Sequence, residues 1–319
     1  MNNNRPKVSV LIPVFNGARF LAECLESVLA QDFTDMEILV GDDHSTDESC
    51  ALLEKFAARD PRIRWWRNPR NLGLAANFNC CLRAAQGEYV KFVLQDDVLL
   101  GPEAIRLLVA ELDAHPAVAL VASASYLLDA QSRKTEHRNY FAAGITAGHQ
   151  VILRCLEQPG NLIGEPSLVM FRRDQALRGF DENYRQLVDW EMWIHLLAQG
   201  DFAYVAKPLA AFRIHAAQQT QLNKEQLVEG EESLRLLEHC CRQPWFSKIL
   251  TRKILFVQLY CLRRHPVVTS GALYREMKHT LGFGWYCVYL LQRKLLKPFT
   301  KLGLWLARVP FRLGLHETP

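Results

Sequence analysis

Val8-Ser-Val-Leu-Ile-Pro-Val14 is a short, nearly continuous apolar run, and Phe15-Asn16-Gly17 follows it at once. Such a run is typical of a strand that is buried on both faces of a sheet. Apolar residues then recur at helical spacing from Phe20 to Leu29, and a second short apolar run covers residues 38–40. The alternation between these two periods continues to about residue 125, so we expect strands and helices to alternate.

The pattern predicts strands at 8–14, 38–40, 63–66, 89–94 and 118–122, and helices at 20–29, 47–59, 74–85 and 103–115. Ser45-Thr-Asp-Glu48 has the form of a capping box for the second helix. Further along, we expect a hairpin or loop at 129–139, strands at 167–171 and 202–205, and helices at 149–157, 189–198 and 225–241. The predicted fold is therefore α/β, with a Rossmann-like, mostly parallel central sheet flanked by helices and a helical C-terminal extension. In such sheets the ligand crevice lies at the carboxyl ends of the strands.

The composition is that of an ordinary globular protein. Among 319 residues, 49% are hydrophobic and 23% are charged, which excludes a disordered or low-complexity chain. The net charge of +4 is unevenly divided, because residues 241–319 contain 14 Lys and Arg against 2 Asp and Glu. That segment carries +12 and the rest of the chain −8. We expect one region over 1–220 and a basic, helical region over 221–319.

The cysteines and the apolar segments give weaker indications. None of the nine cysteines forms a C-x-x-C pair, and several lie on apolar helical faces, so we interpret them as core thiols in a reducing compartment. The N-terminus has no apolar signal core, and no uncharged apolar stretch reaches the roughly 18 residues that span a bilayer. We therefore expect a cytoplasmic protein.

Two pairs of carboxylates follow strands that end at the same predicted sheet edge. Asp42 and Asp43 follow the second strand, and Asp96 and Asp97 follow the fourth. Adjacent like charges are costly unless a cation or hydrogen bonds offset them, so the second pair suggests Mg²⁺ or Mn²⁺ and, with it, a nucleotide diphosphate. Two structural alternatives stay open. The first pair also suits an Asx turn, and the second suits the N-terminus of a helix that begins near Gly101-Pro102.

These segments together resemble a known family. Val8–Asn16, Asp42–Asp47, Asn71–Gly73 and Gly87–Asp97 are similar, in order and in spacing, to the motifs of the family 2 glycosyltransferases of the GT-A fold. The resemblance covers about residues 7–215. It is highly specific for the family and weak for the substrate.

The resemblance implies a role for each matching position. Residues implied to bind the nucleotide sugar are Pro13, Phe15, Asp42, Asp43, Asn71, Gly73, Asp96 and Arg213. Asp42 would accept a hydrogen bond from the base, and Asp96 would hold the ion that bridges the diphosphate. Asp97 and His215 are the other implied metal ligands. The chain departs from the family at Leu94, where many members have an acid, and at Phe15, where Tyr is commoner.

The resemblance places the catalytic base at Asp189, in Val188-Asp-Trp-Glu-Met-Trp193. Deprotonating an acceptor hydroxyl as the new bond forms requires one such carboxylate, and direct displacement by a single base predicts inversion at the sugar carbon. Glu191 is the second choice. Asp189 is equally suited to cap a helix, and a single histidine such as His215 is often structural.

The last segment separates charge from apolar residues. At about 100° per residue, one side of a helix formed by this segment carries its basic residues, which are Arg293, Lys294, Lys297, Lys301, Arg308 and Arg312. The other side carries leucines, Phe299 and Trp305. Pro298 breaks or kinks this segment, so we expect two helices. This pattern is typical of an interfacial membrane helix, and the alternative is a helical pair packed on the catalytic domain. No nucleic-acid-binding motif accompanies the basic residues.

The sequence therefore predicts an inverting glycosyltransferase. It would use a nucleotide-diphosphate sugar, Mg²⁺ or Mn²⁺, and a glycan or lipid-linked glycan acceptor, in bacterial cell-surface polysaccharide assembly. It would lie at an anionic membrane surface on the cytoplasmic face of the inner membrane. The main alternative is a non-catalytic relative that binds nucleotide sugars or acts as a scaffold. A nucleotidyltransferase is less well supported, because Asn16-Gly17-Ala18-Arg19 supplies no Gly-rich phosphate loop.

Overall fold

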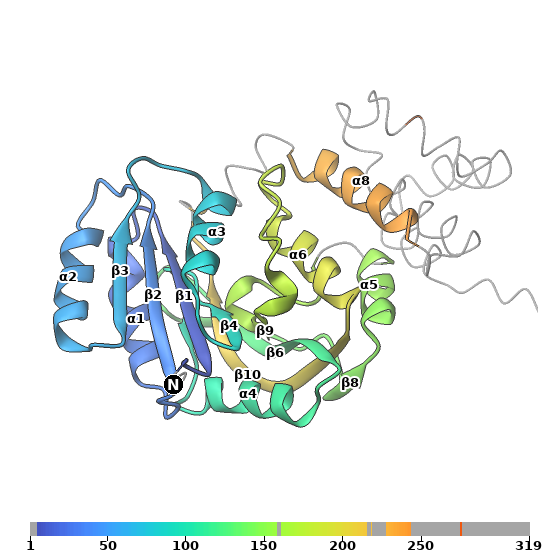
Figure 1. Cartoon of the computed structure of the whole chain (residues 1–319), viewed down its shortest axis with the longest axis horizontal. Coiled ribbons are helices and arrows are strands. Elements are labelled where there is room, and N and C mark those ends of the chain that lie inside the picture. Colours follow the sequence, from blue (N-terminus) through green and yellow to red (C-terminus); the bar gives the residue numbers. More distant parts are fainter. Residues whose placement is uncertain (1–4, 158–160, 216–217, 219–227, 244–274, 276–319) are drawn as a thin grey trace, which may run out of the picture. The chain divides into compact units, whose positions relative to one another are not determined.

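The computed structural model describes residues 5–157, 161–215, 218, 228–243 and 275 (Figure 1). The chain divides into two compact units, residues 1–152 with 161–226, and residues 153–160 with 227–319. The first unit contains the sheet. In the second, helix α8 (Val228–Cys241) confirms most of the helix predicted at 225–241, and its buried apolar side chains are Leu234, Leu236, Leu237 and Cys240.

The first half of the sheet is parallel. Strands β1 (Val8–Val14), β2 (Met36–Asp42), β3 (Ile63–Arg67) and β4 (Tyr89–Phe92) lie in the order β3-β2-β1-β4. Val8 pairs with Met36 on one side and with Tyr89 on the other, so the strands run in the same direction. Every residue of β1 and β2 is buried, as the continuous apolar runs predicted.

Helices cover both faces of this half. Helix α1 (Ala18–Leu29) packs against α2 (Ser49–Arg59), α2 also contacts β3, and α3 (Leu74–Ala84) packs on β1 and β2 (Figure 1). Right-handed crossovers place α1 and α2 on one face, and place α3 on the other, because its connection runs back toward β4. The chain order therefore reverses beside β1, which is where α/β sheets bind ligands.

The second half of the sheet is mixed. Beyond β4 the order is β9 (Val169–Arg172), β6 (Val118–Leu128), β10 (Asp201–Arg213) and β5 (Val98–Leu99). Strand β9 runs antiparallel to both β4 and β6, whereas β6 and β10 are parallel. The remaining strands are β7 (Lys134–Arg138), which completes the predicted hairpin with β6, and β8 (Gly144–Thr146), which pairs with β10. The α/β fold class is confirmed, and its parallel part is the N-terminal half.

The remaining helices of the described residues are α4 (Ala104–Ala114), α5 (Gly148–Leu156) and α6 (Val188–Leu197), with 3-10 turns at Pro166–Leu168 and Asp174–Ala176. The predicted helices at 103–115, 149–157 and 189–198 are thus confirmed to within about two residues, the usual uncertainty of helix ends.

Two strands are longer than predicted. Strand β6 continues from 122 to Leu128, and β10 continues from 205 to Arg213, because the two pair along almost their whole length. Pro208 lacks an N–H, and the register of β10 with β6 is irregular on either side of it, which accommodates the missing donor. The extension matters because it brings Arg213 to the predicted site.

The capping box predicted for the second helix was wrong. Helix α2 begins at Ser49, and no side chain caps its N-cap residue Glu48. The Ser45 hydroxyl instead accepts the Asn16 N–H, while Asp47 accepts the N–H groups of Ala18 and Ser49. These polar side chains tie the turn after β2 to the turn after β1.

The basic C-terminal pattern at 293–312 lies outside the described residues. No helix among those the structure describes is long and apolar enough to cross a bilayer. Among the described residues, Cys24, Cys50, Cys80 and Cys81 are free thiols.

Candidate active site

The carboxyl ends of β1, β2 and β4 converge. The Asp43 N–H donates to the Val14 carbonyl at 2.7 Å. The side-chain amide of Gln95 forms two hydrogen bonds with the backbone of Phe15, at 2.8 and 3.0 Å. The predicted nucleotide residues after the three strands therefore share one edge, and the Phe15 ring is 46% exposed there. Pro13 lies in β1 beside Gly41 of β2.

Asp42 is completely buried, and only one of its two carboxylate oxygens accepts hydrogen bonds from the described residues. Its Oδ2 accepts the Ser45 N–H at 3.0 Å and lies 3.6 Å from Arg67 Nε. Its Oδ1 has no hydrogen-bond partner among the described residues. A buried acceptor without a donor is costly, so this oxygen is suited to a donor from a ligand.

Asp43 holds the loop before α3. Its carboxylate accepts the N–H groups of Leu72 and Gly73, each at 2.9 Å, and the Asn68 side-chain amide at 2.9 Å. The Asn71 side chain donates to the Asp43 carbonyl at 3.4 Å. Gly73 has φ +88°, which an L-residue rarely adopts. Asp43 thus has a structural role, but its partners lie 25 to 30 residues along the chain, so these bonds are not the expected Asx turn. They shape the loop that contains Asn71 and Gly73.

Asp96, in the turn after β4, lies next to His215, which follows the end of β10. Asp96 Oδ2 lies 3.0 Å from His215 Nε2, and the Gln218 side-chain amide donates to the same oxygen at 3.4 Å. The His215 ring also packs against Phe20, with 5.0 Å between ring centroids. The described residues contain no group of three or more His, Cys, Asp and Glu placed to hold a metal. An oxygen and an imidazole nitrogen, both partly exposed, fit a divalent ion that takes its other ligands from phosphates and water.

Asp97, also predicted as a metal ligand, lies in the interior. It is completely buried, and its Oδ1 accepts the Arg213 N–H at 2.9 Å. Burial, followed by the neighbouring Asp96 carboxylate, raises the pKa of Asp97 well above its usual range. Asp97 therefore links the turn after β4 to the end of β10.

Arg213 differs from its predicted contact with a ligand. Its side chain is completely buried, and the guanidinium donates to the Asp96 carbonyl at 2.7 Å, the Ser132 hydroxyl at 2.8 Å and Glu23 Oε2 at 2.8 Å. It also lies over the Phe20 ring, 4.4 Å from the centroid. Each guanidinium nitrogen already has an acceptor in the protein, so Arg213 holds Asp96 in place from behind.

Asp189 lies in the first turn of α6. Its Oδ2 accepts the Asn161 side-chain amide at 3.1 Å, and its Oδ1 accepts the Trp190 N–H at 2.8 Å. Burial raises the pKa of Asp189 to about 7, and the Glu165 carboxylate contributes in the same direction. A carboxyl group with a pKa near neutrality is suited to general base catalysis. Glu191, the second choice, is instead paired with Arg178 at 2.8 Å.

Glu165 lies within electrostatic reach of both halves of the site. Its carboxylate raises the pKa of Asp97 as well as that of Asp189. Two residues further on, the Ser167 hydroxyl accepts the Leu94 N–H at 2.8 Å, which ties this segment to the turn that carries Asp96. The segment Glu165–Ser167 thus connects the predicted base with the predicted metal site.

Sequence reasoning missed Lys91, Glu23 and Asn161. Lys91 is completely buried in β4, where its ammonium donates to the carbonyls of Ser167 and Val169, and burial lowers its pKa to about 7. A charged residue within the apolar run 89–94 was the available signal for Lys91. Glu23 and Asn161 follow no pattern, because their partners Arg213 and Asp189 lie far along the chain.

The chain is similar to proteins of one known family. Residues 9–178 match the model of the glycosyl transferase family 2. The uncharacterized protein MT1568 of Mycobacterium tuberculosis is 34% identical over 235 residues, covering 69% of this chain and 71% of that protein. The chondroitin synthase of Escherichia coli is 28% identical over 204 residues, which is 63% of this chain and 28% of the synthase.

Solved structures show the same fold. S. aureus TarS 1-349 in complex with UDP-GlcNAc superposes with a TM-score of 0.69 at 16% identity, covering 95% of this chain and 89% of that one. The mannosyltransferase PcManGT of Pyrobaculum calidifontis, in complex with GDP-Man and Mn²⁺, has a TM-score of 0.59 at 18% identity, covering 95% and 86%. The GT-A fold is thereby confirmed, and the chain belongs to glycosyl transferase family 2.

Proposed function

We propose that this glycosyltransferase moves a sugar from a nucleotide-diphosphate donor to an acceptor hydroxyl with inversion at the sugar carbon. The observation that supports it best is the grouping at one sheet edge of Asp42, which has an unpartnered oxygen, with the Asp96–His215 pair. Asp189, whose pKa is raised toward neutrality, is linked to them through the segment Glu165–Ser167.

The donor base is proposed to be uracil. Asp42 Oδ1 is an acceptor without a donor, and the guanidinium of Arg67, 44% exposed, lies beside the same carboxylate. An acceptor next to a donor matches the N–H and C=O groups of an imide edge. Phe15 supplies an exposed apolar face for the base or ribose. S. aureus TarS, which shares the fold, was solved in complex with UDP-GlcNAc.

Asp96 and His215 would hold a divalent cation, Mn²⁺ or Mg²⁺. When bound, such an ion neutralises charge on the diphosphate leaving group. Asp97 and Arg213 are proposed to support this pair from the interior, since the Arg213 guanidinium donates to the Asp96 carbonyl and the Arg213 N–H donates to Asp97. Phe20 lies against both His215 and Arg213 and limits their movement.

Asp189 is proposed to act as the general base. In its ionised form it accepts the proton of the acceptor hydroxyl while the hydroxyl oxygen attacks the anomeric carbon and the bond to the diphosphate breaks. The Asn161 amide donates to Oδ2 and orients the carboxylate. A single base with no second nucleophile gives inversion.

The acceptor is proposed to be a glycan or lipid-linked glycan of bacterial surface polysaccharide. The relative named chondroitin synthase supports polysaccharide synthesis. The basic and apolar faces predicted at 293–312 support binding to an anionic membrane surface, on the cytoplasmic face of the inner membrane.

The test is a panel of nucleotide sugars assayed for hydrolysis and transfer with Mn²⁺, and again after chelation. We expect activity with a UDP-sugar that chelation removes. Asp96→Ala should lose metal-dependent binding of UDP in calorimetry, and Asp189→Asn should keep UDP binding and lose transfer. The conservative exposed change Asp174→Asn is the control. Full activity in both Asp96→Ala and Asp189→Asn would show that the mechanism is wrong, and UDP binding without any turnover would favour a non-catalytic protein.

A further inference from the structure

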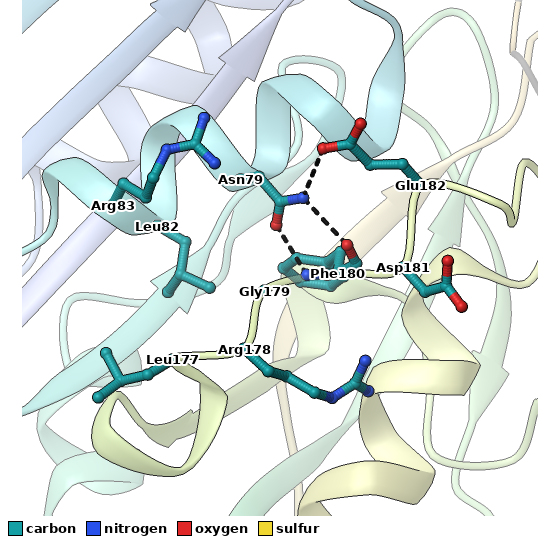
Figure 2. A pocket seen from close by; sticks show the side chains of 9 residues that line it. All are labelled: Asn79, Leu82, Arg83, Leu177, Arg178, Gly179, Phe180, Asp181 and Glu182. Carbon is teal, nitrogen blue, oxygen red and sulfur yellow. Dashed lines mark hydrogen bonds between the residues drawn. The ribbon is translucent and has the colours of Figure 1, made fainter.

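A cavity of about 480 Å³ lies between the C-terminal half of α3 and the loop 177–182, which leads from β9 toward α6 (Figure 2). Its lining residues are Asn79, Leu82, Arg83 and the loop residues Leu177–Glu182. The proposed reaction uses none of them. The loop contacts elements from two parts of the site, because α3 begins at the Gly73 loop and α6 carries Asp189 in its first turn.

Asn79 fastens the loop to α3. Its Oδ1 accepts the Phe180 N–H at 2.7 Å, and its Nδ2 donates to the Phe180 carbonyl and to Glu182 Oε1, each at 3.0 Å (Figure 2). Gly179 allows this approach, because its φ is +81° and an added Cβ would lie 2.7 Å from Asn79 Oδ1. Asn79 is buried, so its amide groups have exchanged water for the loop.

Aromatic packing fixes the same point. The Phe180 ring packs edge-on against Phe78 of α3, at 5.2 Å, and against Phe92 of β4, at 5.5 Å. Phe180 is buried, so both its backbone and its side chain are held by elements that end or begin at the nucleotide edge. The loop therefore has a defined position relative to α3 and β4.

Arg178 fastens the loop to α6. Its Nη2 donates to both carboxylate oxygens of Glu191, at 2.9 and 2.8 Å. Glu191 is buried, so losing the guanidinium would leave a carboxylate with little solvent. Glu191 lies two residues after Asp189 in the first turn of the helix. Any shift of this turn moves both carboxylates.

We propose that Asn79 and Arg178 are positioning residues for Asp189, acting through loop 177–182, which sets the first turn of α6 relative to the nucleotide-binding elements. Only the expected loss of kcat rests on the proposed function, in which Asp189 is the general base. The structural link from α3 through the loop to α6 stands apart from any activity.

The test compares Arg178→Met with Arg178→Lys and with Arg83→Met. Arg83 lines the same cavity but donates to Cys80 Sγ of its own helix, so it is the matched control. We expect Arg178→Met to lower kcat roughly 10- to 100-fold, because small displacements of a catalytic group have effects of this size. Donor KM and the Kd of UDP with Mn²⁺ should stay within about twofold, since the lost contact is not part of donor binding. Arg178→Lys, which keeps the charge, should recover most of kcat.

Two results would overturn the proposal. One is a kcat for Arg178→Met equal to that of Arg83→Met. The other is a parallel loss of kcat and UDP affinity, which would indicate general loosening of the fold. If Arg178→Met does not fold, Asn79→Ala takes its place in the comparison with Arg83→Met.

Hydrogen exchange separates this proposal from the proposed function. Amides of residues 188–193 should exchange faster in Arg178→Met and in Asn79→Ala than in the wild type or Arg83→Met. This measurement needs no substrate. Unchanged exchange in both variants would refute the link, whereas faster exchange in an enzyme that transfers no sugar would refute only the proposed function. Full transfer by Asp189→Asn would likewise refute only the role of Asp189.

Discussion

Asp189 is partly buried and accepts few hydrogen bonds. Two donors reach it, the Asn161 amide and the adjacent Trp190 N–H, and neither fully replaces water. Asp43, by contrast, accepts three hydrogen bonds, from the Asn68 side chain and from the N–H groups of Leu72 and Gly73. The proposed base and the loop-holding residue are both aspartates, and their surroundings decide which one is suited to proton transfer.

The first prediction concerns pH. A base must be ionised, and burial raises the pKa of Asp189 to about 7, so kcat should fall as the pH is lowered through about 7. Asp189→Asn should lower kcat about 10²- to 10⁴-fold, since general base catalysis has effects of this size. Glu165→Gln should shift this acid-side fall in kcat to lower pH, because the Glu165 carboxylate raises the pKa of Asp189. The pH–rate profile of each variant checks this prediction. An acid-side fall in kcat at the same pH in Glu165→Gln and in the wild type would contradict it.

At the scale of elements, the site is built from turns that strands hold in register. The turns after β1, β2 and β4 are joined by side-chain hydrogen bonds through Ser45 and Gln95, and the Asp43 carboxylate joins the turn after β2 to the loop after β3. Strand β10 then brings Arg213 and His215 to the turn after β4, although it begins at the opposite end of the sheet beside Val118. The length of β10, including its irregular passage through Pro208, therefore determines whether His215 reaches Asp96.

The second prediction concerns the loop before α3. Asp43→Ala leaves the N–H groups of Leu72 and Gly73 without their acceptor, so we expect a loss of about 2–4 kcal/mol in the free energy of unfolding. UDP affinity should fall as well, because the loop forms one wall of the nucleotide edge. Urea unfolding and calorimetry measure the two effects. Asp35→Ala, at an exposed position, is the control, and equal stability of the two variants would mean that Asp43 does not hold the loop.

At the scale of the whole molecule, charge is divided along the chain. Residues 241–319 carry +12 against −8 for the rest, and almost all of that segment lies outside the described residues. The proposed binding to an anionic membrane surface follows from this division, since basic residues attract anionic lipid and acidic residues do not.

The third prediction follows from this charge division. The full chain should sediment with vesicles that contain anionic lipid, and binding should weaken as salt is added. Changing Lys294, Lys297 and Lys301 together to Gln should lower vesicle affinity about 100-fold, at about 1 kcal/mol for each charge. Changing Lys55, Lys134 and Lys207, which are exposed or paired in the catalytic unit, is the matched control. Equal loss in both triple variants would indicate non-specific charge attraction.

The sequence by itself determined the alternation of strands and helices, the position of the carboxylates at the strand ends, and the family. These features are local, because each depends on the spacing of a few neighbouring residues. Ser45–Glu48 was misread for the same reason: it has the residues of a capping box, but its hydroxyl is used by Asn16, about 30 residues away.

Only the tertiary structure decided which acidic and basic residues face a ligand. Asp96 and Asp97 are adjacent in sequence, yet one meets His215 at the edge and the other is enclosed beneath it. Arg213 was expected at the leaving group and instead lies inside, where its partners come from α1 and the β6–β7 turn. Burial and hydrogen-bond partners depend on which distant segments the topology brings together, and no local pattern encodes that.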